Sequence, residues 1–382
     1  MGVKGKYTIV FLLCVFMINQ FVYPSSEDKY SPLTVEFNGL FKSDTDVEKW
    51  FKDISSWGVD RWVQFIPNQR RFFYMDDIGN AKIKNVPFIK TVPFFDRVLP
   101  EFTKYQDKKT KKWQEEQVEK AHDLCTEYGI EFYYWFTFPI FPYQDEEVVK
   151  KIMPELFDAD GELNIYHPKL ATLLKMKVKA LKSSLPYLAG VEIYFGEGGG
   201  SIIDFSQNDL ADNRKWLRPL IEAFDEICKE LEIQGIVFPH DYHHTNQTRR
   251  NIYQVLKEYP DLMVTEDLSW PEENTLTPFM GYITEEDEKE LFRNNPVLVN
   301  CLTDTEYVGQ GVLPCILPEW WKYAVNKCIE KEIDVIRGRT FFWDGGYTDS
   351  NFNRMNAYML KEFAQNPDAD ARQVLALAAK EQ

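Results

Sequence analysis

The sequence predicts a single (β/α)8 barrel, an α/β fold in which eight parallel strands alternate with helices. Short apolar runs typical of buried strands alternate with amphipathic segments typical of helices, and eight such pairs follow one another along the chain. The 382 residues contain no internal repeat, low-complexity tract or obvious linker. One barrel routinely takes about 250 residues or more, so this length does not require two domains. A doubly wound open sheet is the competing architecture.

The first three strands lie in the N-terminal 140 residues, at 33–41, 61–66 and 131–138. A helix is expected at 44–57, where a Ser/Asp/Thr cluster can cap its first turn, and another at 114–128, where Gly129 ends it. Residues 74–112 are irregular and rich in Pro, Phe and Lys. We expect a long loop there, with a weak strand at 83–92.

Five further strands and six helices complete the predicted barrel. One strand ends at Gly196, and the others span 234–238, 262–265, 297–302 and 335–339. The helices are expected at 168–184, 213–232, 247–258, 285–293, 320–330 and 351–363.

The composition argues against two classes of partner. The formal net charge is −16 and the pI is about 4.9, so the phosphates of a nucleic acid would be repelled. The same charge disfavours adsorption to an anionic membrane. We therefore expect no nucleic-acid partner.

The N-terminus has the profile of a signal peptide. Two lysines precede an apolar stretch from Tyr7 to Ile18, and polar residues follow it. The stretch is too short for a membrane-spanning helix of about 20 residues. We predict a signal peptide at 1–25, a catalytic barrel domain at 30–382, and a secreted or periplasmic protein without an integral membrane span. No small-x-small cleavage site is visible, which leaves an uncleaved anchor as the alternative.

The cysteines do not form a recognisable framework. Apart from Cys14 in the leader, the chain contains Cys125, Cys228, Cys301, Cys315 and Cys328. Their number is odd, no CxxC occurs, and so large a chain does not need a disulfide scaffold. We expect most of them to be small buried apolar residues, and one disulfide stays open as an alternative.

Three glutamates fall at or just beyond the end of a predicted strand: Glu197, Glu272 and Glu306. Carboxylates at the strand ends of a parallel barrel point into one shared mouth. Glycoside hydrolysis uses one carboxylic acid to protonate the leaving oxygen and one carboxylate to activate water. The pattern therefore predicts a glycoside hydrolase with these three glutamates as catalytic residues. The alternative for Glu197 is a solvated side chain in a flexible loop; the glycines around it lack the Lys and the spacing of a phosphate loop.

A histidine-rich segment, Pro239-His240-Asp241-Tyr242-His243-His244, raises the question of a metal site. The adjacent His243 and His244 would point in divergent directions. A zinc site would also need a third ligand with second-shell support, which a sequence alone cannot show. We favour a sugar-contacting or structural role for His240, and we predict neither a metal nor a cofactor.

Aromatic residues are dense at two predicted strand ends, and they make up 15% of the chain. Most aromatic residues belong to the core, but ring faces also suit the apolar faces of pyranose sugars. Trp135 and Trp343 are the most plausible sugar platforms.

From Pro168 onward the chain resembles the family 67 glycoside hydrolases, the α-glucuronidases that debranch xylan. Gly190 to Gly198 is similar to the family strand that ends in the general acid, and Glu306-Tyr307-Val308-Gly309-Gln310 is similar to its Glu-Tyr-Leu-Gly-Gln signature. Asp261 to Phe279 fits without a gap and puts Glu272 at the position of the catalytic Asp of the family. The resemblance implies that Glu197 is the general acid and that Glu272 and Glu306 share activation of water, with inversion of configuration. The predicted substrate-binding residues are Trp135, His240, Asp267, Tyr307, Arg339 and Trp343.

The chain departs from this family in length and in charge. The family is nearly twice as long, and its N-terminal β-rich and C-terminal helical domains are not evident here. Its basic residues around the acid and base correspond here to Ile193 and Tyr194, to His240 and to Asp267. Arg337 or Arg339 on the last strand is the alternative source of a cation, although both look more like structural or water-shell residues. We therefore expect a neutral sugar at the cleaved position, in a plant or algal polysaccharide or its fragments.

Two other function classes stay open. One is a carbohydrate-binding barrel that has lost a working acid–base pair. The other is a metal-dependent hydrolase or isomerase that uses His240, Asp241 and Glu272. The sequence does not indicate an oligomeric state.

Overall fold

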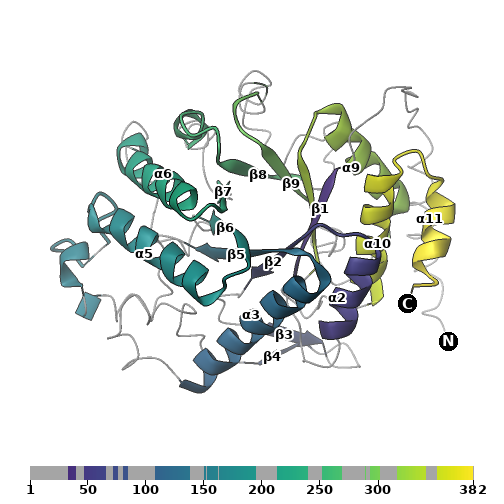
Figure 1. The fold of residues 1–382 in the computed structure, drawn as a ribbon, viewed down its shortest axis with the longest axis horizontal. Coiled ribbons are helices and arrows are strands. Elements are labelled where there is room, and N and C mark those ends of the chain that lie inside the picture. The colour runs from purple at the N-terminus through teal and green to yellow at the C-terminus, as the bar shows by residue number, and fades with distance from the viewer. Residues whose placement is uncertain are drawn as a thin grey trace, which may run out of the picture.

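A computed structural model shows a closed barrel of eight parallel strands with helices around it (Figure 1). The strand order around the barrel is β1-β10-β9-β8-β7-β6-β5-β2, and every neighbouring pair is parallel. The predicted (β/α)8 barrel is confirmed. The structure describes residues 33–39, 47–65, 72–75, 81–84, 108–137, 150–151, 153–161, 163–194, 213–239, 252–268, 289, 293–301, 316–340 and 351–381.

The elements agree closely with the predicted ones. The barrel strands are β1 (Thr34–Gly39), β2 (Arg61–Phe65), β5 (Glu131–Thr137), β6 (Leu188–Tyr194), β7 (Gln234–Phe238), β8 (Met263–Leu268), β9 (Val297–Cys301) and β10 (Val335–Arg339). The helices are α2 (Val47–Ser56), α3 (Lys108–Tyr128), α5 (Lys169–Ser184), α6 (Asn213–Glu230), α9 (Pro318–Glu330), α10 (Asn351–Gln365) and α11 (Ala371–Ala378), with a 3-10 turn at Pro154–Leu156. Residues 252–256 are also helical, within the predicted helix at 247–258. Most of the predicted helix at 285–293 lies outside the described residues.

The prediction for the segment 74–112 was partly wrong. Two short strands, β3 (Phe72–Met75) and β4 (Ala81–Lys84), pair antiparallel in a separate sheet. Only the first two residues of the strand predicted at 83–92 belong to β4, and the rest lie outside the described residues. Helix α3 begins at Lys108, within the expected loop. Its first turns are rich in Lys, a good helix former, and Lys112 pairs with Glu116 one turn later at 3.5 Å.

Helix α11 was not predicted, although it has a clear N-terminal signal. The Asp370 carboxylate accepts hydrogen bonds from the backbone N–H groups of Arg372 and Gln373, which satisfies two donors in the first turn. Ala371, Val374 and Ala378 are buried, and the helix packs beside α10 and α9 (Figure 1).

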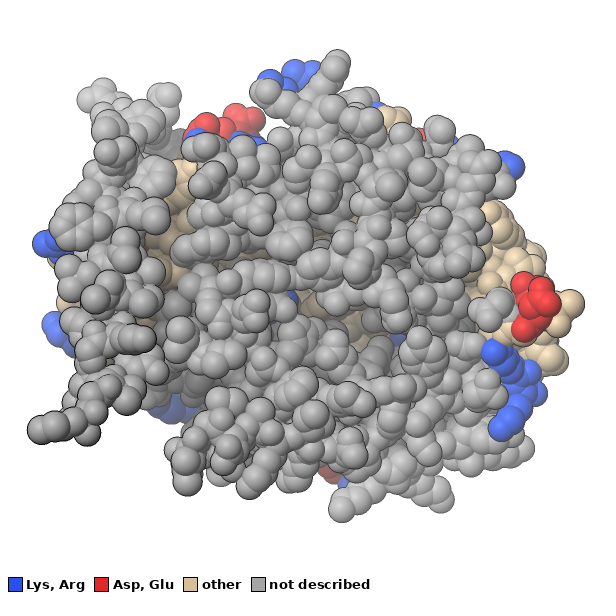
Figure 2. All heavy atoms as spheres, turned by 180° about the vertical axis from the view of Figure 1, so that it is seen from behind, with Lys and Arg blue, Asp and Glu red and all other residues tan. Residues whose placement is uncertain are grey.

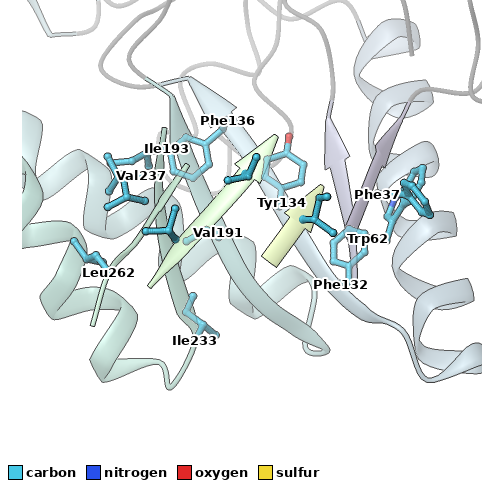
Figure 3. Packing of buried hydrophobic residues seen from close by; sticks show 14 of the residues in the cluster. Phe37, Trp62, Phe132, Tyr134, Phe136, Val191, Ile193, Ile233, Val237 and Leu262 are labelled. Carbon is cyan, nitrogen blue, oxygen red and sulfur yellow. The ribbon is translucent and has the colours of Figure 1, made fainter. Parts of the chain in front are cut away.

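The barrel strands bury both faces, as parallel strands covered by helices do. In β5, the rings of Phe132, Tyr134 and Phe136 belong to the layer between the strands and the helices, whereas Tyr133 and Trp135 lie inside the barrel. Figure 3 labels residues of the outer layer from β1, β2, β5, β6 and β7, together with Ile233 and Leu262 from the turns before β7 and β8. The inner layer comprises Val63, Tyr133, Trp135, Ile236, Phe238, Met263, Leu298 and Val335. Side chains therefore fill the barrel, and the open end of the strands is left for a site.

One glycine is required by close packing inside the barrel. A Cβ atom on Gly190 of β6 would lie 2.2 Å from Cε1 of Tyr133 and 2.7 Å from the Gln234 carbonyl oxygen. The register between β5 and β6 shifts at Phe132 and Tyr133, next to this contact. Gly190 thus leaves the space that the Tyr133 ring occupies.

The four described cysteines, Cys125, Cys228, Cys301 and Cys328, are buried and free, as expected. Burial raises the pKa of Cys328 to about 12, so this thiol stays protonated. Cys14 and Cys315 lie outside the described residues.

Among the described residues, no helix combines the length and the apolar character needed to cross a bilayer. On the face shown in Figure 2, the visible Lys and Arg side chains lie at separate places, most of them near the rim of the view. The predicted signal peptide at 1–25 lies outside the described residues.

Candidate active site at the carboxyl end of the barrel

Inward-facing residues of neighbouring strands line up at the carboxyl end of the barrel. Strand pairing sets Asn38 beside Arg339, Arg337 beside Asn300, and Asn300 beside position 267. In a parallel barrel all strands point the same way, so these positions share one end with the loops that follow the strands. Two of the predicted substrate-binding residues, Asp267 and Arg339, thus belong to strand segments at this end; their contact with a sugar stays a prediction.

Three aromatic rings at the ends of consecutive strands form a cluster inside this end, which we call the aromatic trio. Trp135 of β5 packs edge-on against Tyr194 of β6, with ring centroids 5.4 Å apart, and lies 5.9 Å from Phe238 of β7. The Tyr194 and Phe238 rings are 5.1 Å apart. Trp135 is 8% exposed and Tyr194 is half-buried. The sequence had indicated Trp135 alone; Tyr194 and Phe238 could have been found as the last inward-facing residues of their strands.

A second cluster, which we call the barrel-centre cluster, consists of Glu36, Glu192, Thr265 and Arg337. The Arg337 guanidinium donates through Nε to Glu36 Oε1 on the neighbouring strand β1. Its Nη1 and Nη2 atoms donate to the two oxygens of Glu192 on β6, with a distance of 3.0 Å from Nη1 to Oε1. Three strands separate β10 from β6 in both directions around the barrel. Arg337 therefore spans the full width of the barrel.

The fourth member of the cluster joins another strand to it. The Thr265 hydroxyl of β8 donates to Glu192 Oε1 at 3.1 Å. Glu36, Glu192, Thr265 and Arg337 all have no solvent exposure. The cluster thus ties together β1, β6, β8 and β10 by hydrogen bonds that water cannot replace.

The pKa values in this cluster depend on burial and on the presence of two carboxyl groups beside a single guanidinium group. Burial raises the pKa of Glu36 above its ordinary value, and the neighbouring Glu192 carboxylate adds to the rise, although Arg337 opposes both. Burial alone would lower the pKa of Arg337, but the Glu192 and Glu36 carboxylates raise it instead. Arg337 is therefore a permanent cation that two carboxyl groups already engage, and its predicted structural role is confirmed.

The remaining predicted site residues lie outside the described residues: Glu197, Glu272, Glu306, His240, Tyr307 and Trp343. Each of the three glutamates nevertheless follows a described barrel strand within a few residues in the sequence. Glu197 comes three residues after the end of β6, Glu272 four after β8, and Glu306 five after β9. Since an extended chain spans at most about 3.6 Å per residue, each glutamate is tethered within about 11–18 Å of its strand end.

The described part of the chain contains no group of three or more His, Cys, Asp or Glu side chains arranged to hold a metal ion. The segment that raised the question of a metal, with His240 and Asp241, lies outside it.

The chain is similar in structure to a GH138 enzyme targeting pectin rhamnogalacturonan II, with a TM-score of 0.57 and 13% sequence identity, over 90% of this chain and 40% of that chain. It is also similar to a GH20 exo-β-N-acetylglucosaminidase from Vibrio harveyi, with a TM-score of 0.49 and 10% identity, over 92% and 57% of the two chains. A β-amylase catalytic domain from Paenibacillus polymyxa gives a TM-score of 0.48 and 8% identity, over 87% and 98%.

The likeness to the GH138 enzyme supports the barrel architecture, and the chain spans less than half the length of that enzyme. No protein-family model matches the chain, and no curated protein matches it in sequence.

Proposed function

We propose that the chain is a glycoside hydrolase whose active site lies at the carboxyl end of the barrel. The observation that carries the proposal is the placement of β6, β8 and β9, which lie within four adjacent strands of the closed barrel and each lead within five residues to a glutamate. Catalytic residues of (β/α)8 barrels come from the ends of several different strands at this face. The architecture shared with the GH138 enzyme supports the same class of reaction.

In this proposal Glu197 is the general acid that protonates the leaving oxygen. Glu272 and Glu306 activate and orient the hydrolytic water. The resemblance to the family 67 enzymes supports this division of roles and an inverting mechanism. In an inverting enzyme the acid and the base stand about 6.5–9.5 Å apart, which leaves room for a water molecule between base and sugar.

We expect the substitutions Glu272→Gln and Glu306→Gln to lower kcat by a factor on the order of 10² or more each, because each removes a group that acts on the attacking water. Steady-state kinetics on one good substrate would measure both effects. Glu266→Gln on β8 is a control from the strand that precedes Glu272. Near-normal turnover of either variant would remove that glutamate from the mechanism.

The substrate is proposed to be a plant or algal polysaccharide or its fragments, handled outside the cytoplasm after export through the leader at 1–25. The aromatic trio supports a carbohydrate, because its rings are held inside the carboxyl end of the barrel next to the strand that leads to Glu197. Trp135 and Tyr194 are the more exposed members of the trio.

The engagement of Arg337 by two carboxyl groups favours a neutral sugar at the cleaved position. A uronate carboxylate in a water-poor pocket needs cationic partners, since an unpaired buried charge costs several kcal/mol. Arg337 is committed to Glu36 and Glu192 and has no exposed surface. The half-buried Arg339 is then the described cation nearest to this end of β10.

We therefore expect neutral aryl glycosides to be hydrolysed with a higher kcat/KM than the corresponding aryl glucuronides. A panel of such substrates at one pH would measure the preference. Fast release of 4-O-methylglucuronic acid from xylan oligosaccharides, without turnover of any neutral glycoside, would contradict it. No turnover of any member would instead favour a carbohydrate-binding barrel.

A further inference from the structure

The barrel-centre cluster contains two carboxyl groups but a single guanidinium group, all fully buried. The nearest other charges on the inner face correct this imbalance only in part. Arg61 of β2 acts on Glu36 and lowers its pKa, but the Arg61 Nε atom pairs with Glu131 of β5 at 3.0 Å. Arg339 lies two residues further along β10 and is partly exposed. With both carboxyl groups ionised, the cluster itself would hold a net negative charge in the middle of the barrel, which is unfavourable away from water.

The two carboxyl groups are not equally supported. Glu192 accepts from both terminal nitrogens of Arg337 and from the Thr265 hydroxyl, so three donors stabilise its carboxylate. Glu36 accepts one hydrogen bond, from Arg337 Nε to Oε1. Its other oxygen, Oε2, is buried and has no hydrogen-bond partner. A proton shared between two carboxyl groups settles on the one with fewer donors.

We propose that Glu36 is a neutral carboxylic acid near neutral pH, with its proton on Oε2, so that the barrel-centre cluster carries no net charge. Oε1 is engaged by the guanidinium, which leaves Oε2 as the site of the proton. Asn38 lies two residues further along the same face of β1, and its Oδ1 atom is also buried without a hydrogen-bond partner. The proton gives this face a donor that Asn38 can use directly or through one water. The raised pKa of Glu36, caused mainly by burial, agrees with this assignment.

The assignment has a consequence for the site above the cluster, and this consequence rests on the proposed function. Glu192 lies five residues before Glu197 in the sequence. A charged cluster would add one more negative charge beneath the three proposed catalytic glutamates and raise their pKa values. A neutral cluster fixes β6 and β8 without shifting the pH range in which the acid and base work. Glu36 and Arg337 are then positioning residues rather than catalytic ones.

The proposal predicts an asymmetry between two matched substitutions, Glu36→Gln and Glu192→Gln. Glutamine resembles a protonated glutamate, so the unfolding equilibrium of Glu36→Gln should match that of wild type below about pH 4.5. Near neutral pH the variant should unfold less readily than wild type, because only the wild-type residue ionises on unfolding. Glu192→Gln removes a carboxylate with three donors, and the unfolding equilibrium constant should rise by a factor of about 100 or more. Urea unfolding monitored by circular dichroism measures both. Equal destabilisation by the two variants, or failure of Glu36→Gln to fold, would overturn the proposal.

The pH dependence gives an independent test that needs only wild type and Glu36→Gln. The unfolded Glu36 loses its proton near its ordinary pKa of 4.5, whereas the folded protein keeps it to higher pH. The stability that this group contributes is therefore fully present below that pH and is lost as the pH rises towards the folded pKa. The ratio of the wild-type to the variant unfolding constant should increase about tenfold per pH unit over this window. A ratio that stays flat or falls with rising pH would contradict a protonated Glu36.

Infrared spectroscopy detects the proton itself. Wild type near neutral pH should show the C=O stretching band of a buried carboxylic acid, and Glu36→Gln should lack it; a wild-type spectrum without the band would refute the assignment. In a glycosidase assay the variant should keep the wild-type pH–rate profile, and a shifted profile would show that a charge had been lost at position 36. An inactive wild type would count against the proposed function and leave the infrared and unfolding results standing.

Discussion

Replacing Glu197 with glutamine is expected to remove most activity on natural glycosides and to spare substrates with very good leaving groups. A general acid contributes a factor of about 10² to 10⁴ by protonating the leaving oxygen. A nitrophenolate-type leaving group needs little protonation, so the same substitution should cost it far less. The two kcat ratios, variant over wild type, for an unactivated and an activated substrate measure the difference.

The control for Glu197→Gln is Glu155→Gln, at the exposed 3-10 turn Pro154–Leu156, which should be near wild type on both substrates. An equal loss by Glu197→Gln on activated and unactivated substrates would show that Glu197 does not act as the acid. Such a result would be compatible with a role in orienting water or substrate instead.

The second large effect concerns stability, and it follows from the geometry of the barrel-centre cluster. Arg337→Met is expected to lower the free energy of unfolding by about 3–5 kcal/mol, the usual cost of removing one partner of a buried ion pair. The substitution strands the Glu192 carboxylate in the barrel with only the Thr265 hydroxyl as a donor. It also removes the donor that Glu36 has. Chemical denaturation of wild type and variant would measure the loss.

Arg339→Met is the matched control, because Arg339 lies on the same face of the same strand two residues further on and is partly exposed. Its loss should cost well under half as much as the loss of Arg337. If the two variants were equally stable, the ion pairs across the barrel would contribute little to the fold.

The sequence was sufficient to predict the barrel because the signals for each strand and each helix lie within the element itself. Each strand is a short apolar run, and each helix that follows carries its own periodicity and end signals, so eight strands were predicted within a few residues of their observed bounds. The start of α3 and the β3–β4 pair were missed, because their Lys-rich and Pro-rich composition suggested a loop. The structure instead has an antiparallel strand pair and a helix with an ion pair one turn apart. Helix α11 was missed despite its Asp370 cap, because it lies beyond the last strand that the barrel pattern requires.

The interior of the barrel could not be predicted in the same way. Glu36 and Arg337 are 301 residues apart in the sequence, and Glu192 and Arg337 are 145 apart, so only closure of the barrel brings them together. Glu192 looks in the sequence like one polar residue inside an apolar strand, without a sign of its partner. The aromatic trio was missed for the same reason. Trp135 stands in an aromatic-rich stretch of the sequence, but its packing on Tyr194 and Phe238 depends on the pairing of three neighbouring strands.

The most direct test of a water-activating glutamate pair at the carboxyl end of the barrel is the anomeric configuration of the first product. Proton NMR during hydrolysis of a neutral glycoside by fresh enzyme distinguishes the two anomers before they equilibrate. We predict that the inverted anomer appears first, because Glu272 and Glu306 direct water to the face opposite the leaving group while Glu197 protonates the leaving oxygen. A product that first appears with retained configuration would contradict this account and would require one of the glutamates to act as a nucleophile.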